Sequence, residues 1–209
     1  MTRRRRNGGL GRRDFGAATL AFALLGPSTL ATTAARAGSD DMLIDDFSSS
    51  DLTSALGTGW RGVSDRVMGG VSEATVARAH IDGRDALRLS GDVRLENNGG
   101  FIQAALDLTP TDRVLDASAF TGLRLIVRGN GESYSLHLRT PDNLRPWQSY
   151  RSHFTAGPGW HTVDLPFSDF TPHRLDTPLD TSRLRRLGLV AIGRAFRADL
   201  AVASLSFYR

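Results

Sequence analysis

The sequence predicts an all-β protein, an antiparallel sandwich or jelly roll of about nine or ten short strands. Apolar and charged residues alternate with a period of two, as in Leu87-Arg88-Leu89 and Leu123-Arg124-Leu125. That period is typical of a strand with one buried face. Turn residues (Gly, Pro, Asn and Asp) separate such segments, and no long helical pattern follows the N-terminal region.

Nine segments carry the strand pattern: 71–80, 86–95, 101–108, 123–128, 134–139, 148–155, 160–165, 187–192 and 200–207. Gly129-Asn130-Gly131 predicts a tight hairpin between the fourth and fifth segments. Single helical turns are expected at 50–56, capped by Ser50, and at 182–187. Because neither a repeat nor a low-complexity linker interrupts the pattern, we expect one domain over residues 42–209.

Residues 1–37 have the parts of an export signal. A basic stretch from Arg3 to Arg13 precedes an apolar stretch from Phe15 to Leu25, which is shorter than the roughly 20 residues of a transmembrane helix. Ala35-Arg36-Ala37 fits the small-residue cleavage pattern, which predicts cleavage after Ala37. An N-terminal membrane anchor or a buried helix is the alternative interpretation.

The pair Arg12-Arg13, followed by Asp14-Phe15, resembles the R-R-x-F motif of twin-arginine signals. Gly11 and Gly16 replace residues that are usual beside that motif. The leader therefore predicts a periplasmic or secreted protein that crosses the membrane by the twin-arginine route. The chain contains no Cys, which excludes a lipoprotein anchor and disulfide bonds.

The basic character of the chain belongs to this leader. Of 26 basic and 22 acidic residues, seven arginines and Asp14 lie in residues 1–37. The remaining 19 basic and 21 acidic residues give residues 38–209 a net charge of −2. A nucleic-acid partner is therefore not expected, since such proteins carry a basic stripe.

Two glycine-rich segments, 60–72 and 96–101, are the candidate binding rim. Paired glycines permit close backbone approach, so N–H groups there can face a ligand. The alternative is that both segments are turns or bulges, with Asp65 and Asn97 bonded to their own backbone. The candidate residues are Trp60, Asp65, Arg66, Met68, Gly69, Gly70 and Ser72 in the first segment, and Asn98, Gly99, Gly100 and Phe101 in the second.

Aromatic residues in loops add to this rim. Trp147 and Tyr150 lie near Arg145 and Arg151, and rigid rings beside polar groups suit carbohydrates and peptides alike. Trp147 follows Pro146 in a polar loop and is expected to be exposed, whereas the alternative for Trp60 and Trp160 is a place in the core.

The motif Ser64-Asp65-x-Val67-Met68-Gly69-Gly70-x-Ser72, after Trp60, resembles the hallmark of the complex I intermediate-associated protein 30 family, the NADH:ubiquinone oxidoreductase assembly-factor domain. The resemblance continues through 98–101, 128–134, 150–154 and 160–170, which spans nearly the whole mature chain. It implies a galactose-binding-like jelly roll. Arg174-Leu175 stands where the family usually has an R-G pair, so that loop is expected to differ.

No catalytic motif stands out in the sequence. The five histidines are scattered and form no metal-binding spacing, and no G-x-S-x-G elbow is present. Asp65, Glu73 and Glu96 are conceivable carboxylates for glycoside hydrolysis. Asp45, Asp46 and Asp65 are weak candidates for a structural calcium, and neither a metal nor a cofactor is predicted.

The leading hypothesis is an exported, non-catalytic module that binds a protein or glycan through the rim, with membrane contact only during export. Two alternatives stay open. One is an assembly or chaperone-like factor for a membrane respiratory complex, as the resemblance implies for mitochondrial members. The other is a hydrolase of envelope glycans that uses the loop carboxylates.

Overall fold

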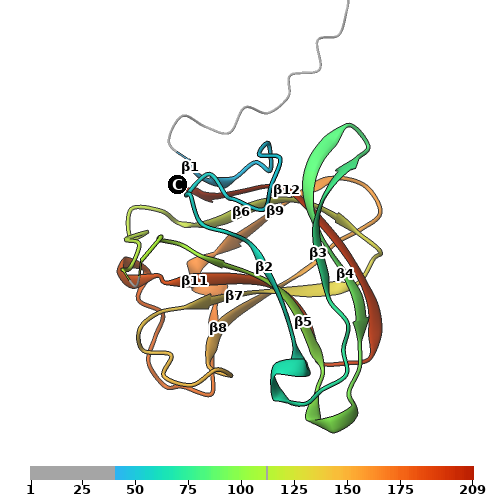
Figure 1. Cartoon of the computed structure of the whole chain (residues 1–209). Coiled ribbons are helices and arrows are strands. Elements are labelled where there is room, and N and C mark those ends of the chain that lie inside the picture. The colour runs from blue at the N-terminus through green and yellow to red at the C-terminus, as the bar shows by residue number, and fades with distance from the viewer. Residues whose placement is uncertain (1–40, 112) are drawn as a thin grey trace, which may run out of the picture. The chain divides into compact units, whose positions relative to one another are not determined.

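The computed structural model describes residues 41–111 and 113–209 (Figure 1). Its strands form two antiparallel sheets of six strands each, which confirms the predicted all-β sandwich. The predicted export signal, with Arg12, Arg13, Ala35 and Ala37, lies outside the described residues. Among those residues, no helix has the length and apolar character needed to cross a membrane.

The first sheet has the strand order β3-β4-β12-β6-β9, and β1 also pairs with β12. β12 is the longest strand and pairs with β4, β6 and β1. The strands are β1 (Met42–Asp45), β3 (Thr75–Ile81), β4 (Arg84–Val93), β6 (Gly122–Gly129), β9 (His161–Pro166) and β12 (Phe196–Tyr208).

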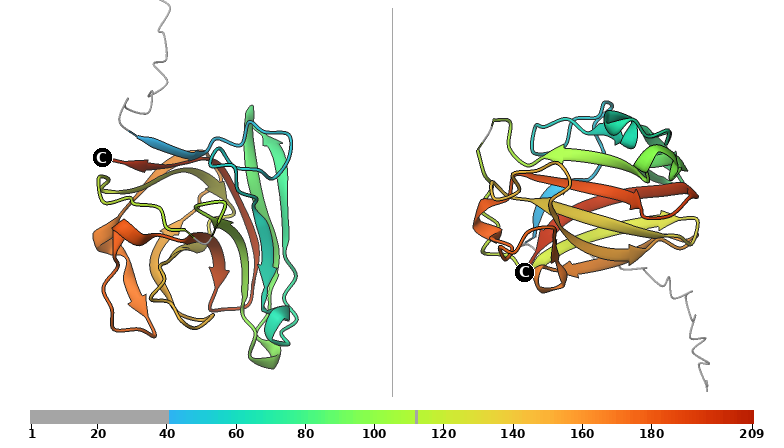
Figure 2. Two further views of the ribbon diagram at one scale, coloured as in Figure 1. Left: turned by 60° about the vertical axis from the view of Figure 1, so that its left-hand side comes forward. Right: turned by 90° about the horizontal axis from the view of Figure 1, so that it is seen from below.

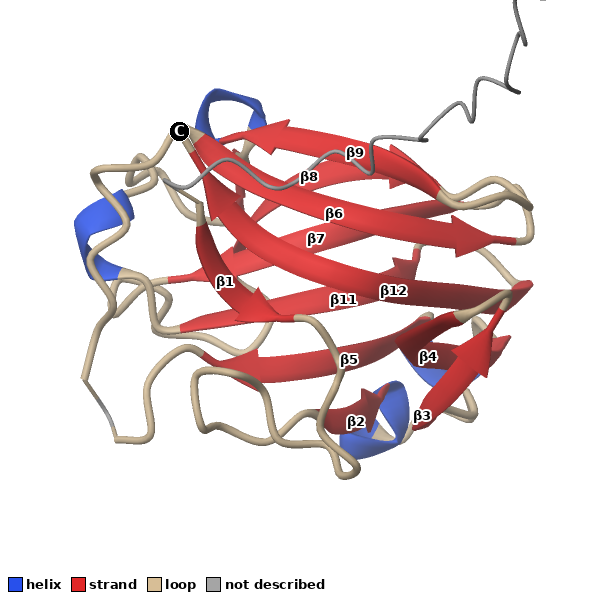
Figure 3. Cartoon of the chain, turned by 90° about the horizontal axis from the view of Figure 1, so that it is seen from above, coloured by secondary structure: helices blue, strands red, loops and turns tan. Residues whose placement is uncertain are grey.

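The second sheet has the order β10-β8-β7-β11-β5-β2. In Figure 3 its strands β8, β7, β11 and β5 lie behind β9, β6 and β12 of the first sheet, and helical turns are confined to connections. The strands are β2 (Arg61–Ser64), β5 (Phe101–Asp107), β7 (Ser133–Arg139), β8 (Ser149–Thr155), β10 (Thr171–His173) and β11 (Arg186–Ile192).

The core fills the space between the sheets with alternate residues of each strand. Ile102, Leu106 and Leu189 of the second sheet are buried, and so are Leu125 and Val127 of the first. Each fully buried aliphatic side chain of this kind stabilises the fold by about 1.5–3 kcal/mol relative to exposure. The alternating pattern in the sequence therefore arises because the strands of both sheets bury one face in this shared core.

A bulge in β12 keeps its side chains on the correct face. Leu200 and Val202 point into the core at even positions, whereas Leu205 and Phe207 do so at odd positions. The register with β6 shifts between Val202 and Ser204, so Ala203 is the extra residue. One inserted residue reverses the parity of a strand, which lets β12 curve across its sheet without turning its apolar residues to solvent (Figures 2 and 3).

The nine strand segments expected from the sequence all overlap strands of the structure. Three more strands, β1, β2 and β10, were not expected as separate elements. They have four, four and three residues, respectively, which is too short to display an alternating pattern. The described chain therefore has twelve strands rather than nine or ten.

The hairpin expected at Gly129-Asn130-Gly131 is wrong. The turn joins β6 to β7, which belong to different sheets. The Tyr134 hydroxyl donates a hydrogen bond to Asn130 Oδ1 at 2.7 Å and so fixes this crossover. A true hairpin joins β3 to β4 through Asp82-Gly83, where both φ angles are positive (47° and 76°), as a type I′ turn requires.

Helical turns are few and short. The turn expected at 182–187 appears as the 3₁₀ helix η4 (Thr181–Arg183), capped by the Asp180 side chain. The helical turn expected at 50–56 is wrong: this segment forms bends and a single turn closed by the Gly57 N–H and the Ser54 carbonyl at 2.9 Å, and Thr53 and Gly59 form a bridge. The other 3₁₀ helices are η1 (Asp65–Met68), η2 (Glu96–Asn98) and η3 (Phe167–Asp169).

Candidate functional site

The two glycine-rich segments are crossovers between the sheets. The first leads from β2 through η1 to β3, and the second leads from β4 through η2 to β5. Both lie at the same end of the sandwich, side by side (Figures 1 and 2). Asn97 Nδ2 of the second crossover donates to the carbonyl of Gly69 in the first at 3.2 Å, so the two loops are in direct contact.

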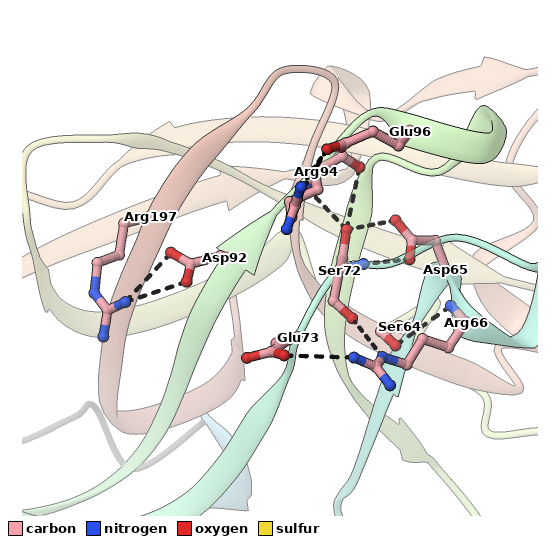
Figure 4. Close-up of polar contacts among 9 residues, drawn as sticks. All are labelled: Ser64, Asp65, Arg66, Ser72, Glu73, Asp92, Arg94, Glu96 and Arg197. Atoms are coloured by element: carbon pink, nitrogen blue, oxygen red, sulfur yellow. Dashed lines mark hydrogen bonds and ion pairs between the residues drawn. The ribbon is translucent and has the colours of Figure 1, made fainter.

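Asp65 joins these crossovers from within. Its carboxylate is fully buried and accepts hydrogen bonds from the Ser72 backbone N–H (2.9 Å) and hydroxyl (2.5 Å). It also accepts from the backbone N–H of Gly100 at 2.6 Å and, more weakly, of Phe101 at 3.4 Å. One carboxylate therefore satisfies donors on both loops, and Figure 4 shows its contact with Ser72.

The glycines of the motif are required by the packing around this carboxylate. A Cβ atom on Gly70 would lie 2.3 Å from Asp65 Cγ, and one on Gly99 would lie 2.4 Å from Asp65 Oδ2. Neither distance is possible for real atoms, so a side chain at either position would displace Asp65. The paired glycines thus allow close backbone approach, but toward Asp65 rather than toward a ligand.

The electrostatics of Asp65 follow from the same contacts. Burial opposes ionisation, but the hydrogen bonds from the Ser72 hydroxyl and from the N–H groups of Gly100 and Ser72 outweigh it. The pKa of Asp65 is therefore held below its ordinary value of 3.8. At neutral pH the carboxylate is charged, and its charge is delocalised over fixed donors.

Charged side chains cover the outside of this junction (Figure 4). Arg66 donates from Nε to the Ser72 carbonyl at 3.1 Å and approaches Glu73 at 3.4 Å. Arg94 pairs with Glu96. These exposed pairs contribute little stability on their own, so they are best described as a solvated cover over a rigid junction.

The rim borders a groove of about 820 Å³ on the outer face of the second sheet. Alternate residues of β2, β5, β11, β7 and β8 form its floor because the other alternate residues point into the core. One row runs across five strands in register, and its members are Arg61, Ala105, Gly188, His137 and Arg151. Gly188 lies at the centre, where the Gln103 side chain occupies the place of a side chain at position 188.

The two ends of the groove differ in chemistry. One end carries Val67 and Met68 of the rim and the adjoining Leu95, which are 73%, 55% and 50% exposed, next to Phe101. Trp147, in the loop between β7 and β8, borders the groove and is 50% exposed. The groove thus joins an aliphatic end, a polar floor and one accessible indole ring.

Hydrogen bonds from the Arg139 side chain hold the Trp147 loop in place. Arg139 donates to the backbone carbonyls of Asn143, Arg145 and Pro146 at 3.1, 2.9 and 3.3 Å. A backbone fixed by three hydrogen bonds presents its side chain at low cost in conformational entropy. Trp147 is therefore exposed, as the sequence predicted, and its loop is held in place, as a binding residue requires.

His137 is a buried polar group on the groove floor. Its Nε2 atom has no hydrogen-bond partner among residues 41–111 and 113–209. Burial, followed by the charge of Arg151, lowers the pKa of His137 to about 3, so the ring is neutral at physiological pH. A buried group without a partner costs about 1–3 kcal/mol, which a hydrogen-bonding ligand would offset.

Several predicted rim residues do not reach the surface, and this corrects the sequence-based site. Trp60 is a core residue whose Nε1 donates to Asp45 Oδ2 at 2.7 Å, and Tyr150 is buried with its hydroxyl bonded to the Pro178 carbonyl at 3.2 Å. Asp65, Gly70 and Ser72 are buried in the junction. The predicted residues that line the groove are Met68, Gly99, Gly100, Phe101 and Trp147.

Arg66, Gly69 and Asn98 belong to the loops but do not line the groove. Gly69 caps η1 in the left-handed conformation, and Asn98 also has positive φ. They shape the rim rather than the floor.

Most residues of the groove floor were not predicted from the sequence. Arg61, Gln103, His137, Arg139 and Arg186 line the groove, although none was a candidate; Arg151 was named only as a neighbour of the aromatic residues. The alternating pattern of apolar and polar residues does carry a signal for these side chains, because it places them on the face of each strand opposite the core residues. What it does not reveal is the order of the strands, and without that order the residues cannot be assembled into one surface.

The calcium candidates are engaged otherwise. Asp45 accepts from Trp60 and from the Phe47 N–H, and Asp46 accepts from Ser48. Within the described part of the chain, no group of three His, Asp or Glu residues is arranged to hold a metal ion.

Comparison with known proteins gives a family and a fold. The family model described as Complex I intermediate-associated protein 30 (CIA30) matches residues 46–202. No curated protein sequence matches the chain.

Among solved structures, similar folds include carbohydrate-binding modules of Clostridium thermocellum. The family 11 module of the cellulase Lic26A-Cel5E has a TM-score of 0.61 at 14% identity and covers 80% of this chain and 94% of its own. A family 11 module from Clostridium thermocellum in complex with a β-1,3-1,4-mixed-linked tetrasaccharide also scores 0.61 at 14% identity, with coverage of 80% and 95%. The family 30 module of Cel9D-Cel44B scores 0.57 at 17% identity, with coverage of 79% and 95%. At these identities the likeness shows the jelly-roll fold.

Replacing Asp65 with Asn tests the junction. The variant keeps the shape but turns one acceptor into an amide donor that faces N–H and O–H donors. We expect a loss of about 3 kcal/mol in the free energy of unfolding at pH 7, measured in urea. The control is Asp92→Asn, which removes an exposed carboxylate that lies 3.3 Å from Arg197, and it should change stability by less than about 0.5 kcal/mol.

The difference between the native protein and Asp65→Asn should depend on pH. Because the folded pKa of Asp65 is lowered, its ionised form stabilises the fold above the ordinary value of 3.8. That contribution is lost as the pH falls through the lower, folded pKa. The difference should therefore shrink in this acid range, and a difference that persists unchanged there would contradict the role of the charge.

Proposed function

The chain belongs to the Complex I intermediate-associated protein 30 family, and from this premise we propose that it is an exported, non-catalytic module that binds a glycan in the groove of its second sheet. The observation that carries the proposal is the groove itself. It combines an accessible, well-supported Trp147 with a floor of guanidinium, imidazole and amide groups. Its volume of about 820 Å³ lies within the range of small-molecule sites.

Sugar recognition has two physical requirements that this groove supplies. The apolar face of a sugar ring packs on an aromatic ring, and its hydroxyl groups need planar, fixed hydrogen-bonding partners. Trp147 supplies the ring, and Gln103, Arg151 and His137 supply partners at alternate strand positions. The solved modules of similar fold are named as carbohydrate-binding modules, which supports the same kind of ligand here.

The non-catalytic part of the proposal rests on the carboxylates. A glycosidase needs two of them facing one bond. Asp65 is buried and saturated by backbone and Ser72 donors, whereas Glu73 and Glu96 face Arg66 and Arg94, respectively. None of these three carboxylates lines the groove, and the family and the similar modules are binding or assembly-type domains.

A second candidate function is a protein partner, in keeping with the name of the family. The observation that favours it is the exposed aliphatic cluster of Val67, Met68 and Leu95 at one end of the groove. A glycan has little use for such a cluster, whereas exposed apolar patches mark protein contacts. In this case the rim would dock on a subunit of a membrane respiratory complex.

The glycan proposal predicts a specific loss with Trp147→Ala. Removing the ring should weaken binding to the best ligand of a panel of neutral and acidic oligosaccharides about tenfold, measured by calorimetry. Trp160→Ala is the matched control, because Trp160 packs on the first sheet against Ala86 and Ala201 and lies outside the groove. Equal losses in both variants, or no binding to the panel, would contradict the proposal.

The protein-partner candidate predicts a different loss. If the aliphatic cluster docks on a respiratory complex, subunits of that complex should co-purify with the protein, and Val67→Asp should abolish their recovery. Leu144→Asp is the control, since Leu144 is also exposed but does not line the groove. Recovery that is absent from the native protein, or reduced equally by both changes, would reject this candidate.

Export by the twin-arginine route is tested with the leader. Replacing Arg12 and Arg13 with Lys keeps the charge but removes the paired guanidinium groups. We expect the protein to accumulate in the cytoplasmic fraction, detected by fractionation and blotting. Arg4→Lys with Arg5→Lys is the control and should leave export unchanged; normal export of the Arg12/Arg13 variant would reject the route.

A further inference from the structure

Positive charge is concentrated in the groove. Arg61, Arg139, Arg151 and Arg186 come from four different strands and all line it. Asp107 forms ion pairs with two of them: it lies 2.7 Å from Arg61 and 2.6 Å from Arg186. Four guanidinium groups against one carboxylate leave three formal positive charges, although residues 38–209 together carry −2.

Two of these arginines have no acidic partner. Among residues 41–111 and 113–209, no carboxylate lies within ion-pair distance of Arg139 or Arg151, and the polar contacts of both are with neutral groups. Both side chains are partly buried. Burial, followed by the neighbouring positive charges of Arg186 and Arg185, lowers the pKa of Arg139. Burial, followed by the charge of Arg174, lowers that of Arg151.

The outer face of the first sheet is different. Arg88 forms two hydrogen bonds of 2.8 Å with Asp199, and Arg124 forms bonds of 2.7 and 2.8 Å with Asp164. Arg128 is paired with Asp82 through one contact. The same chain thus neutralises these arginines with an acid from a neighbouring segment, but leaves the arginines of the groove in excess.

The excess positive charge lies on the groove floor, where a bound ligand would contact it. Arg151 lies beside His137 in the register of the sheet, and His137 has Gly188 on its other side. The groove floor therefore has the Gln103 amide over Gly188, a cation at Arg151, and between them His137, whose buried Nε2 atom has no partner among the described residues. Trp147 lies at the same border, since its carbonyl is the acceptor of a long contact (3.5 Å) from Arg151.

From this juxtaposition we infer that the ligand of the groove is an acidic glycan, with a carboxylate group that binds Arg151 while one sugar ring packs on Trp147. This inference rests on the proposed glycan-binding function and names its substrate class. A guanidinium group binds a carboxylate through two parallel hydrogen bonds, which fixes orientation as well as charge. Partly buried guanidinium groups without acids are destabilised in the free protein, so a ligand carboxylate gains more from them than from solvated ones.

The test compares ligands that differ only in charge. Oligogalacturonate carries one carboxylate on each sugar, and its methyl ester has the same rings without the charge. We expect the native protein to bind the free acid at least tenfold more tightly than the ester, with an affinity that falls as salt rises. Arg151→Gln should abolish most of this preference. Arg197→Gln removes the same charge from the opposite sheet and should preserve it.

The other outcomes separate the two proposals. Equal binding of acid and ester, without salt dependence, overturns the acidic class but leaves the glycan function standing. Tight binding of neutral mixed-linked β-glucan oligosaccharides alone has the same meaning. Binding of poly-glutamate as tight as that of oligogalacturonate overturns the glycan part, because charge alone would then explain the result. No binding of any saccharide overturns both. The comparison of acid with ester uses the unaltered protein, so it does not depend on how the variants fold.

Discussion

The structure depends on one buried carboxylate that holds two chain crossings together. β2 and β5 belong to one sheet, and β3 and β4 belong to the other, so the chain must cross between the layers twice at this edge. Asp65 binds backbone N–H groups of Ser72 on the first crossing and Gly100 on the second. An isolated buried charge is costly, but here the carboxylate accepts hydrogen bonds from three backbone N–H groups and from the Ser72 hydroxyl. The junction therefore sets how the rim, and with it the aliphatic end of the groove, stands over the second sheet.

The two outer faces of the sandwich differ in how their arginine side chains are paired. On the first sheet, Arg88 and Arg124 each meet an aspartate on a neighbouring strand, which makes a solvated and self-neutralised surface. On the second sheet, Asp107 is shared between two arginines, and Arg139 supports the Trp147 loop through backbone carbonyls. Self-neutralised surfaces have little to offer a charged ligand, whereas unneutralised ones attract it over a Debye length. This difference between the faces is the reason for placing the proposed ligand on the second sheet.

The strand prediction succeeded where the period-two signal was long enough to read. Segments such as 123–128 alternate over a full strand, because one face is buried against the same core. It failed at β10, which has three residues, and at Gly129-Asn130-Gly131, where a turn sequence typical of a hairpin joins strands of different sheets. A tight turn fixes the reversal of the chain but not the partner of the next strand. The bulge at Ala203 was equally invisible, since it changes only the parity of residues within one apolar strand.

The sequence by itself determined the all-β class, the family and the importance of Asp65 with its paired glycines. These are local properties: they are written in alternation and in a contiguous motif. Only the tertiary structure decided that the motif is a buried junction. A Cβ atom on Gly70 would lie 2.3 Å from Asp65 Cγ, and this distance depends on how the folded backbone brings the two residues together. Only the strand order decided that Arg61, His137 and Arg151 share one row, since these residues are separated by up to 90 positions in the chain (151 − 61). A surface assembled from alternate residues of five strands has no linear signature, and that is the physical reason why the groove could not be predicted from the sequence.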